Sequence, residues 1–307
     1  MSARELVVLG TASQVPTRYR NHNGYLLRWD AEGVLFDPGE GTQRQMISAA
    51  VTASMINRIC ITHFHGDHCL GFASMVQRIS LDRVAHTVDV HYPGSGQVYY
   101  DRLRRASIFH DVSRISPHPI RQAGVIAECK AFTLRTLSLD HGVDTWGFRL
   151  DEPGSRTMLP DKLKAARVRG PAVGELLRKG QIEVDGRKVV LADVSVDRPG
   201  QSLAFVMDTR LCDNAYELAR GVDLLVCEST YLHQDVDKAR SNGHMTARQA
   251  AMVARDAGAR RLVLTHFSQR YQSTKPFLAE AREIHEDVVA ARDGDVVPVP
   301  KRLRVPE

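Results

Sequence analysis

Short apolar segments recur along the chain, and in its second half they alternate with longer segments of helical spacing. The apolar segments predict strands at 6–9, 25–29, 34–36, 59–62, 88–92, 129–139, 203–207, 224–227 and 262–264. Helices are predicted over 42–50, 70–79, 246–257 and 276–290. Thr246 can cap the third helix, and Pro276 suits an initial helical position. Hairpin-like strands early and strand–helix repeats late predict an α/β fold with two sheets covered by helices.

Several predicted strands end in a polar residue that can do chemistry. The strand at 59–62 ends at His63, the strand at 203–207 ends at Asp208, and the strand at 262–265 ends at His266. Strand ends that meet at one rim are how open α/β sheets build sites, so we expect these residues to converge.

A dense run of metal-ligand residues follows the first of these strands. His63, His65, Asp67 and His68 form a His-x-His-x-Asp-His pattern. Imidazole and carboxylate together suit zinc and similar borderline cations. A single tetrahedral ion does not need four such ligands as well as partners elsewhere in the chain, so the pattern predicts two metals that share one site.

Composition narrows the class of protein. The chain has 307 residues, 43% hydrophobic and 25% charged, as expected of one large globular α/β domain or two small ones. No apolar run approaches the roughly 20 residues that span a bilayer, and the N-terminus lacks a secretory pattern. The five cysteines are scattered without a Cys-x-x-Cys motif. We therefore expect a cytoplasmic protein with reduced thiols and no membrane association.

Positive charge is concentrated in one part of the chain. The whole sequence has 41 Lys and Arg against 36 Asp and Glu, a net charge of +5. Residues 156–180 alone hold seven basic and two acidic residues, which is also +5. They lie within 151–200, a Pro- and Gly-containing stretch that interrupts the strand–helix rhythm, with short helices predicted at 159–166 and 172–179. The stretch is either a solvated surface insertion or a protruding basic arm.

Five motifs in order give the chain a resemblance to a known family over nearly its full length. They are the histidine run, Asp37 in Phe36-Asp-Pro-Gly-Glu-Gly, His141 in Leu139-Asp-His-Gly, Asp208 in Met207-Asp-Thr and His266 in Leu264-Thr-His-Phe. The sequence resembles ribonuclease Z, the tRNA 3′-processing endonucleases of the metallo-β-lactamase superfamily. The resemblance implies a four-layer αββα sandwich, with residues 1–307 as a single domain and a tRNA-binding arm inserted at about 151–200.

The resemblance also implies roles for the motif residues. His63, His65 and His141 would bind one zinc ion, and Asp67, His68 and His266 the other, with Asp208 bridging and Mn²⁺ a possible substitute. Asp67 would also be the proton acceptor for the attacking water. Asp37 would support the ligands without binding metal itself.

Glu228 in Cys227-Glu-Ser-Thr and His244 in Gly243-His-Met-Thr match positions that assist departure of the 3′-oxygen in the family. A carboxylate that fixes the tautomer of a histidine and raises its pKa makes it a suitable general acid. A capping or surface histidine is an equal alternative for His244 if the residues alone are considered.

Two further elements resemble substrate-binding parts of the family. Pro16-Thr-Arg-Tyr-Arg-Asn21 is similar to a Pro-x-Lys-x-Arg-Asn loop near the cleavage site, so Arg18, Arg20 and Asn21 are expected to contact substrate. Arg18 replaces a point-charge Lys with a planar fork. Gly170 and Pro171 resemble the Gly-Pro element of the tRNA-binding exosite. Met207 and Cys227 stand where the family usually has Gly and His.

Three functions remain open on these observations. The first is a zinc-dependent endoribonuclease, a cytoplasmic homodimer without an obligate protein partner, in which metal-activated water cleaves precursor tRNA after the discriminator nucleotide. The products would be a tRNA 3′-hydroxyl and a trailer 5′-phosphate. The second is a hydrolase of small esters, such as a cyclic-nucleotide phosphodiesterase or an arylsulfatase, which would need neither the arm nor the loop. The third is a non-catalytic RNA-binding protein.

Overall fold

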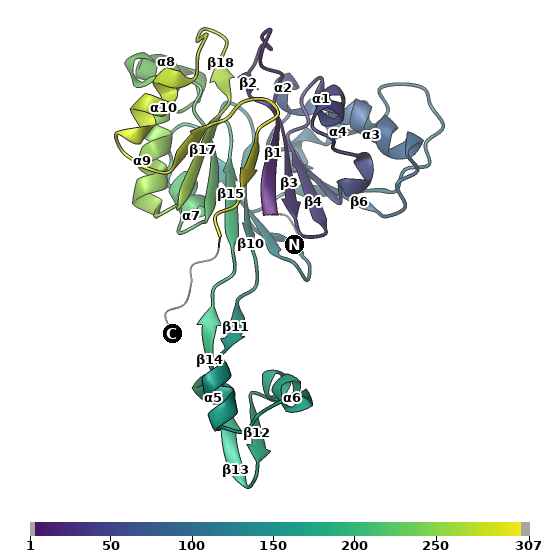
Figure 1. Cartoon of the computed structure of the whole chain (residues 1–307). Coiled ribbons are helices and arrows are strands. Elements are labelled where there is room, and N and C mark those ends of the chain that lie inside the picture. The colour runs from purple at the N-terminus through teal and green to yellow at the C-terminus, as the bar shows by residue number, and fades with distance from the viewer. Residues whose placement is uncertain (1–3, 302–307) are drawn as a thin grey trace. The chain divides into compact units, whose positions relative to one another are not determined.

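The computed structural model describes residues 4–301, which form two compact units. The larger unit comprises 4–151 and 202–300, and residues 152–201 form a second unit, called here the inserted unit. Figure 1 shows the elements of both. No helix within 4–301 combines the length and apolar character that crossing a membrane requires.

The larger unit is built on two seven-stranded sheets. The first has the order β20 (Val296–Pro298), β1 (Arg4–Gly10), β3 (Gly24–Trp29), β4 (Glu32–Phe36), β5 (Arg58–Cys60), β6 (Val88–Pro93) and β7 (Ile115–Ile120). The second has the order β19 (Val288–Ala290), β17 (Arg261–Thr265), β16 (Leu224–Glu228), β15 (Ser202–Val206), β10 (Thr145–Asp151), β9 (Thr133–Leu139) and β8 (Gly124–Glu128). Each sheet has a parallel half, β4 to β7 in the first and β15 to β19 in the second, so each brings several strand ends to one rim.

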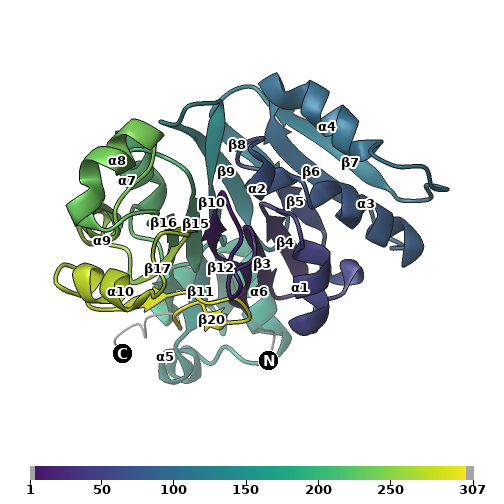
Figure 2. The same cartoon turned by 90° about the horizontal axis from the view of Figure 1, so that it is seen from above.

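Helices cover the outer face of each sheet. On the first sheet these are α1 (Thr42–Ser48), α3 (Phe72–Leu81) and α4 (Gln97–Arg104), and on the second they are α7 (Asp213–Ala219), α9 (Ala247–Ala257) and α10 (Lys275–Arg282). Shorter elements are α2 (Gly66–Cys69), α8 (Val236–Asn242), β2 (Ala12–Ser13), β18 (Phe267–Ser268) and 3-10 turns at Ala53–Met55, Gly94–Gly96 and His233–Asp235. Figure 2 shows the sheets between the two groups of helices.

The main core lies between the two sheets. Phe36 of the first sheet stacks on Phe205 of the second with ring centroids 4.5 Å apart, and Tyr25 meets Phe205 edge-on at 5.3 Å. All three side chains are fully buried. The predicted α/β sandwich with two helix-covered sheets is therefore confirmed, because apolar side chains fill the space between the sheets and between each sheet and its helices.

Two predicted elements differ from the structure. The helix predicted over 276–290 ends at Arg282, and Val288–Ala290 instead form β19, which pairs in parallel with β17. Val288 and Val289 are β-branched and suit a strand at the sheet edge better than the interior of a longer helix. The strand predicted over 129–139 begins at Thr133, because Cys129 to Phe132 form the turn of the β8–β9 hairpin. The helix starting near Thr246 is present, and Thr246 and Gln249 form a capping box.

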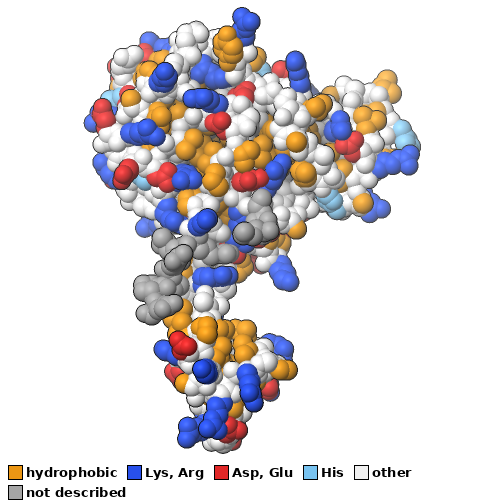
Figure 3. Space-filling model, viewed as in Figure 1, with side chains coloured by type: hydrophobic (Ala, Val, Ile, Leu, Met, Phe, Trp, Pro, Cys, Tyr) orange, Lys and Arg blue, Asp and Glu red, His pale blue; other side chains and the backbone are white. Residues whose placement is uncertain are grey.

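The inserted unit has its own small core. It contains β11 (Ser155–Met158), α5 (Pro160–Ala165), α6 (Pro171–Lys179), β12 (Gln181–Val184), β13 (Arg187–Val190), a 3-10 turn at Leu191–Val194 and β14 (Ser195–Arg198). The β11–β14 pair and the β12–β13 hairpin are antiparallel, and Val168, Leu176, Val189 and Val194 are buried among them. Figure 3 shows Lys and Arg side chains spread over its visible face.

Candidate metal centre

Strand ends and the loops after them bring the predicted ligands together in the larger unit. His63 follows β5, His141 lies between β9 and β10, Asp208 follows β15 and His266 follows β17. Asp67 and His68 lie on the single turn of α2, which continues directly from the histidine run. The ligand atoms of His63, His65, His141 and Asp208 lie within 4.8 Å of one another, and so do those of Asp67, His68 and His266.

Asp208 lies between these two groups of ligands. Its Oδ2 is 3.6 Å from His63 Nε2 and 3.8 Å from His141 Nε2, both of the first group. The same oxygen is 3.3 Å from His68 Nε2, and Oδ1 is 3.2 Å from His266 Nε2, both of the second group. Asp67 Oδ2 completes the second group at 3.4 Å from His68 and 3.5 Å from His266. One carboxylate thus faces both groups, as a bridging ligand must.

Partners on the far side of the rings fix the orientation of four histidines. His68 Nδ1 donates to Asp37 at 2.8 Å, and His141 Nδ1 donates to the carbonyl of Gly243 at 2.8 Å. His63 and His266 pair through Nδ1 with hydroxyl groups, those of the threonines at positions 62 and 230. Each of these rings therefore presents Nε2 to the cluster, which is the usual arrangement around a metal. Asp37 contacts His68 and, within residues 4–301, is not one of the clustered candidate ligands.

The charges of the site favour a cation. Burial alone would lower the pKa of His68, but the carboxylates of Asp208, Asp67 and Asp37 outweigh burial and hold that pKa well above its usual value. The three carboxylates therefore favour positive charge at this position. Within residues 4–301, Asp208 Oδ1 and His266 Nε2 are buried and form no hydrogen bond, although they lie 3.2 Å from each other. Orphaned ligand atoms that face an excess of negative charge fit a divalent metal ion.

The backbone is strained at three residues of the centre. Asp37, Asp208 and His266 have φ values of 43°, 41° and 60°, in the left-handed region that non-glycine residues rarely adopt. Asp37 and His266 come directly after a strand, and a single residue separates Asp208 from the end of β15. The sharp change of direction turns the side chain into the rim, and strain of this kind is concentrated at functional sites.

Glu228 and His244 form a second pair beside Asp208. Glu228 is fully buried at the end of β16, and its Oε1 lies 3.0 Å from His244 Nδ1. The backbone N–H groups of Thr209 and Thr230 also donate to this carboxylate. Burial alone would lower the pKa of His244, but the charges of Glu228 and Asp208 raise it to about 9. His244 does not cap α9, because Thr246 does so.

A cavity of about 490 Å³ gives access to this centre. His65, Asp67, His141, Asp208, His244 and His266 all line it, together with Gln14, Tyr231 and Gln269 from neighbouring loops. The cavity therefore exposes ligand atoms and the His244 ring to the same space. A phosphodiester in this space could reach the metal site and a protonated imidazole at once.

The predicted substrate-binding residues fall into two sets. Arg18 is exposed, and its guanidinium lies 5.7 Å from the centroid of the Tyr19 ring. Arg20 instead donates to the carbonyl of Tyr271, and Asn21 donates to the carbonyl of Glu40, so both hold their own loop in place. In the inserted unit, Gly170 adopts φ 57° and ψ −132°, a conformation that glycine tolerates, and Pro171 begins α6.

Met207 and Cys227 are fully buried in the apolar cores, so neither side chain faces the cavity.

Several supporting residues were not predicted from the sequence. Thr62 donates to Asp37, and Thr230 donates to Glu228 while pairing with His266. The N–H of Gln14 donates to Asp67 at 2.7 Å. Thr62 precedes His63 and Thr230 lies two residues after Glu228, and this nearness to a motif residue was the one available signal. Gln14 could not be found in this way, because it reaches Asp67 from a loop distant in sequence.

Comparison with known proteins gives the same picture along the whole chain. The family model described as the metallo-beta-lactamase superfamily matches residues 17–160, and the beta-lactamase superfamily domain matches 171–267. A ribonuclease Z of Nocardia farcinica is 58% identical over 98% of this chain and 100% of its own length. A ribonuclease Z of Chlamydia trachomatis is 49% identical over 95% of this chain and 96% of its own. The crystal structure of human tRNase Z, short form, superposes with a TM-score of 0.72 at 25% identity and covers 97% of this chain and 100% of the human chain.

Proposed function

Because the chain belongs to the ribonuclease Z family, we propose that it is an endoribonuclease that removes the 3′ trailer from precursor tRNA. Cleavage after the discriminator nucleotide would leave a 3′-hydroxyl on the tRNA and a 5′-phosphate on the trailer. The match to these relatives along the whole chain carries the proposal. The ligand cluster alone would equally serve the hydrolysis of other esters.

We assign two zinc ions to the centre, with Mn²⁺ as a possible substitute. His63, His65 and His141 would hold one ion, and Asp67, His68 and His266 the other. Asp208 would bridge them, in keeping with its position between the two groups. Zinc would lower the pKa of water and offset charge on the phosphate oxygens.

The protein's own residues would move the protons. Burial opposes ionisation of Asp67, but contacts with His68 and His266 keep its pKa low, so the group is a carboxylate that can orient water by accepting a hydrogen bond. We propose that Asp67 also takes the proton of that water. As the water oxygen bonds to phosphorus, the bond from phosphorus to the 3′-oxygen breaks. His244, protonated at neutral pH and held by Glu228, would donate its proton to that oxygen.

The inserted unit would bind the body of the tRNA. Lys162, Lys164, Arg169 and Arg178 are exposed on it, and Gly170 and Pro171 set the start of α6 among them. Cationic side chains gain affinity from phosphates without reading bases, and double-stranded RNA is recognised largely by shape. We further propose a cytoplasmic homodimer, since relatives of this family are expected to act in that form.

Cleavage of a tRNA transcript that carries a 3′ trailer tests the proposal. The purified protein with zinc or manganese should release the intact trailer and a tRNA ending in a 3′-hydroxyl, and EDTA should abolish the reaction. Cyclic nucleotides and aryl sulfates serve as comparison substrates. Efficient hydrolysis of either, with the tRNA left intact, would favour a small-ester hydrolase. Tight tRNA binding without cleavage and with less than one metal ion per chain would favour a non-catalytic binding protein.

A further inference from the structure

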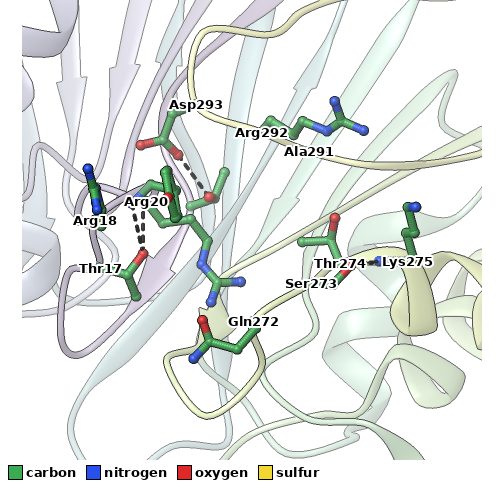
Figure 4. A pocket seen from close by; sticks show the side chains of 12 residues that line it. Thr17, Arg18, Arg20, Gln272, Ser273, Thr274, Lys275, Ala291, Arg292 and Asp293 are labelled. Atoms are coloured by element: carbon green, nitrogen blue, oxygen red, sulfur yellow. Dashed lines mark hydrogen bonds between the residues drawn. The ribbon is translucent and has the colours of Figure 1, made fainter.

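A second cavity of about 490 Å³ lies in the larger unit and is rich in cationic side chains. Its walls are Thr11, residues 17–20, residues 272–275 and residues 291–293. Arg18, Arg20, Lys275 and Arg292 contribute four positive charges to it, against one carboxylate, Asp293. Figure 4 shows Arg18 on one side of Arg20, and Arg292 and Lys275 on the other.

Two of these charged groups already form hydrogen bonds within the protein. Arg20 donates to the carbonyls of Tyr271 and Ser268. Asp293 accepts hydrogen bonds from the Thr11 hydroxyl, the Asn21 N–H and the Gln45 amide at 2.8, 2.6 and 3.2 Å. Asp293 thus links separate segments of the chain around the cavity, and its carboxylate is already engaged by hydrogen-bond donors of the protein.

Three cations remain for a ligand. Arg18, Lys275 and Arg292 are exposed, and none of them forms an ion pair with an acidic side chain within 4–301. Thr274 adds a hydroxyl that makes no capping bond to α10, and the Ser273 hydroxyl accepts from the N–H of Lys275, which leaves its own hydrogen available. Cations that line one cavity repel one another, and an anion bound between them offsets this repulsion. Guanidinium and ammonium groups are both well suited to binding phosphate.

The second cavity and the metal-centre cavity are built on the same two segments. β2 pairs with β18, and Ser13 and Ser268 of this pair line the metal-centre cavity together with the residues that follow them, Gln14 and Gln269. The continuations of both segments, 17–20 and 272–275, line the second cavity. An extended polyanion that crosses the metal centre would therefore find its next cationic site along this pair of segments.

We propose that the second cavity binds a backbone phosphate of the RNA substrate, at a nucleotide outside the cleaved linkage, through Arg18, Lys275 and Arg292. This inference rests on the proposed function and extends the substrate contact beyond the loop that contains Arg18. The phosphate could belong to the trailer or to the acceptor strand of the tRNA. Both offer the same chemistry, and substrates of different trailer length distinguish them.

The test compares Lys275→Ala/Arg292→Ala with wild type and with Arg282→Ala, which removes an exposed arginine of α10 outside the cavity. Precursor tRNAs with trailers of about one and about ten nucleotides are cleaved at several KCl concentrations. We expect the double variant to raise KM about tenfold and to reduce the slope of log(kcat/KM) against log[KCl] by about one. Arg292→Lys, which keeps the charge, should retain most of the wild-type slope.

A loss confined to the long trailer assigns the phosphate to the trailer, and an equal loss with both assigns it to the acceptor strand. The inference is wrong if the double variant matches wild type and Arg282→Ala in KM and salt slope on both RNAs. Equilibrium binding of the same RNAs in EDTA makes the same comparison without cleavage. A wild-type protein that binds but does not cleave would thus refute the proposed function and still decide the role of the cavity.

Discussion

Glu228 and His244 allow proton donation to the leaving oxygen to be tested apart from phosphate binding. We expect His244→Ala to lower the rate of tRNA cleavage by about 10²–10⁴, the usual contribution of a general acid. Glu228→Gln should lower it in the same direction, because the amide cannot raise the pKa of His244 as the carboxylate does. Single-turnover cleavage under saturating enzyme measures both losses.

The control replaces the leaving 3′-oxygen by sulfur. A thiolate leaves without a proton, so His244→Ala should cleave this substrate at nearly the wild-type rate, while a variant with a damaged metal centre should not. An equally slow reaction on both substrates would remove His244 from the role of acid. His285→Ala, at a half-buried histidine that lines neither of the two cavities, serves as the matched substitution.

The sequence identified the residues that cluster at the rim more readily than the residues that orient them. His63, Asp208 and His266 follow the apolar strands β5, β15 and β17 within three residues, so their convergence follows from the fold. Thr62 and Thr230 carry the same importance for ring orientation but have no distinctive motif. The hydrogen bond from Arg20 to the carbonyl of Tyr271 could not be foreseen, because a cation near a loop carbonyl cannot be distinguished in sequence from one that faces solvent.

At the scale of elements, the ends of two helices offer a matched pair of substitutions. Gly243 ends α8 and Gly258 ends α9, with φ values of 77° and 72°. An added Cβ at Gly243 would lie 2.7 Å from His141 Nδ1, whereas one at Gly258 meets nothing within 4 Å. Both changes to Ala should cost about 1–2 kcal/mol of backbone strain. Only Gly243→Ala should displace His141, which we expect to weaken metal binding about 10–100-fold.

Chelator competition measures the metal affinity, and urea unfolding of the metal-free proteins measures the strain. Equal metal affinity in the two variants would show that the contact between Gly243 and His141 does not position the ligand.

The junction of loops at Asp293 predicts a dependence of stability on pH. Burial raises the pKa of Asp293 from 3.8 to about 6. Between pH 4 and 6 the folded protein therefore keeps a proton that the unfolded chain has released, so the free energy of unfolding falls as pH rises through this window. The contribution is about 2–3 kcal/mol. In Asp293→Asn this contribution is absent.

Urea unfolding of metal-free wild type and Asp293→Asn, at intervals from pH 4 to 7, measures the contribution of Asp293 to stability. The stability of wild type relative to Asp293→Asn should decrease by that amount as pH rises, and a constant difference would contradict the assignment. The comparison subtracts every other titrating group, including the buried histidines of the metal centre.

Element boundaries followed the sequence where local signals and burial agreed. The α9 capping box at Thr246 and the apolar strands β15, β16 and β17 were found at nearly their true limits. The prediction of one helix over 276–290 was wrong because the end of this segment pairs with β17. Hydrophobic periodicity does not record such a long-range contact.

At the scale of the whole molecule, the basic stretch 156–180 and the candidate metal centre lie in different units, so they can be separated. Met158 and Ser195 pair at one end of the β11–β14 ladder. Residues 159–194 can therefore be replaced by an Asn-Gly turn that closes the two strands. The larger unit keeps every residue that we propose as a metal ligand, together with Glu228 and His244. We expect tRNA cleavage to fall at least about tenfold and its salt dependence to weaken, because several phosphate contacts are lost.

Hydrolysis of bis(p-nitrophenyl) phosphate reports the state of the metal centre in the same protein and should change little. A second variant, with Lys162, Lys164, Arg169 and Arg178 all changed to Gln, keeps the inserted unit and removes exposed charge alone. If it reproduces the loss, phosphate contacts explain the role of the unit; if only the replacement does, its shape is what matters. Equal losses on tRNA and on the small ester would instead mean that the inserted unit supports the metal centre, and the exosite assignment would be wrong.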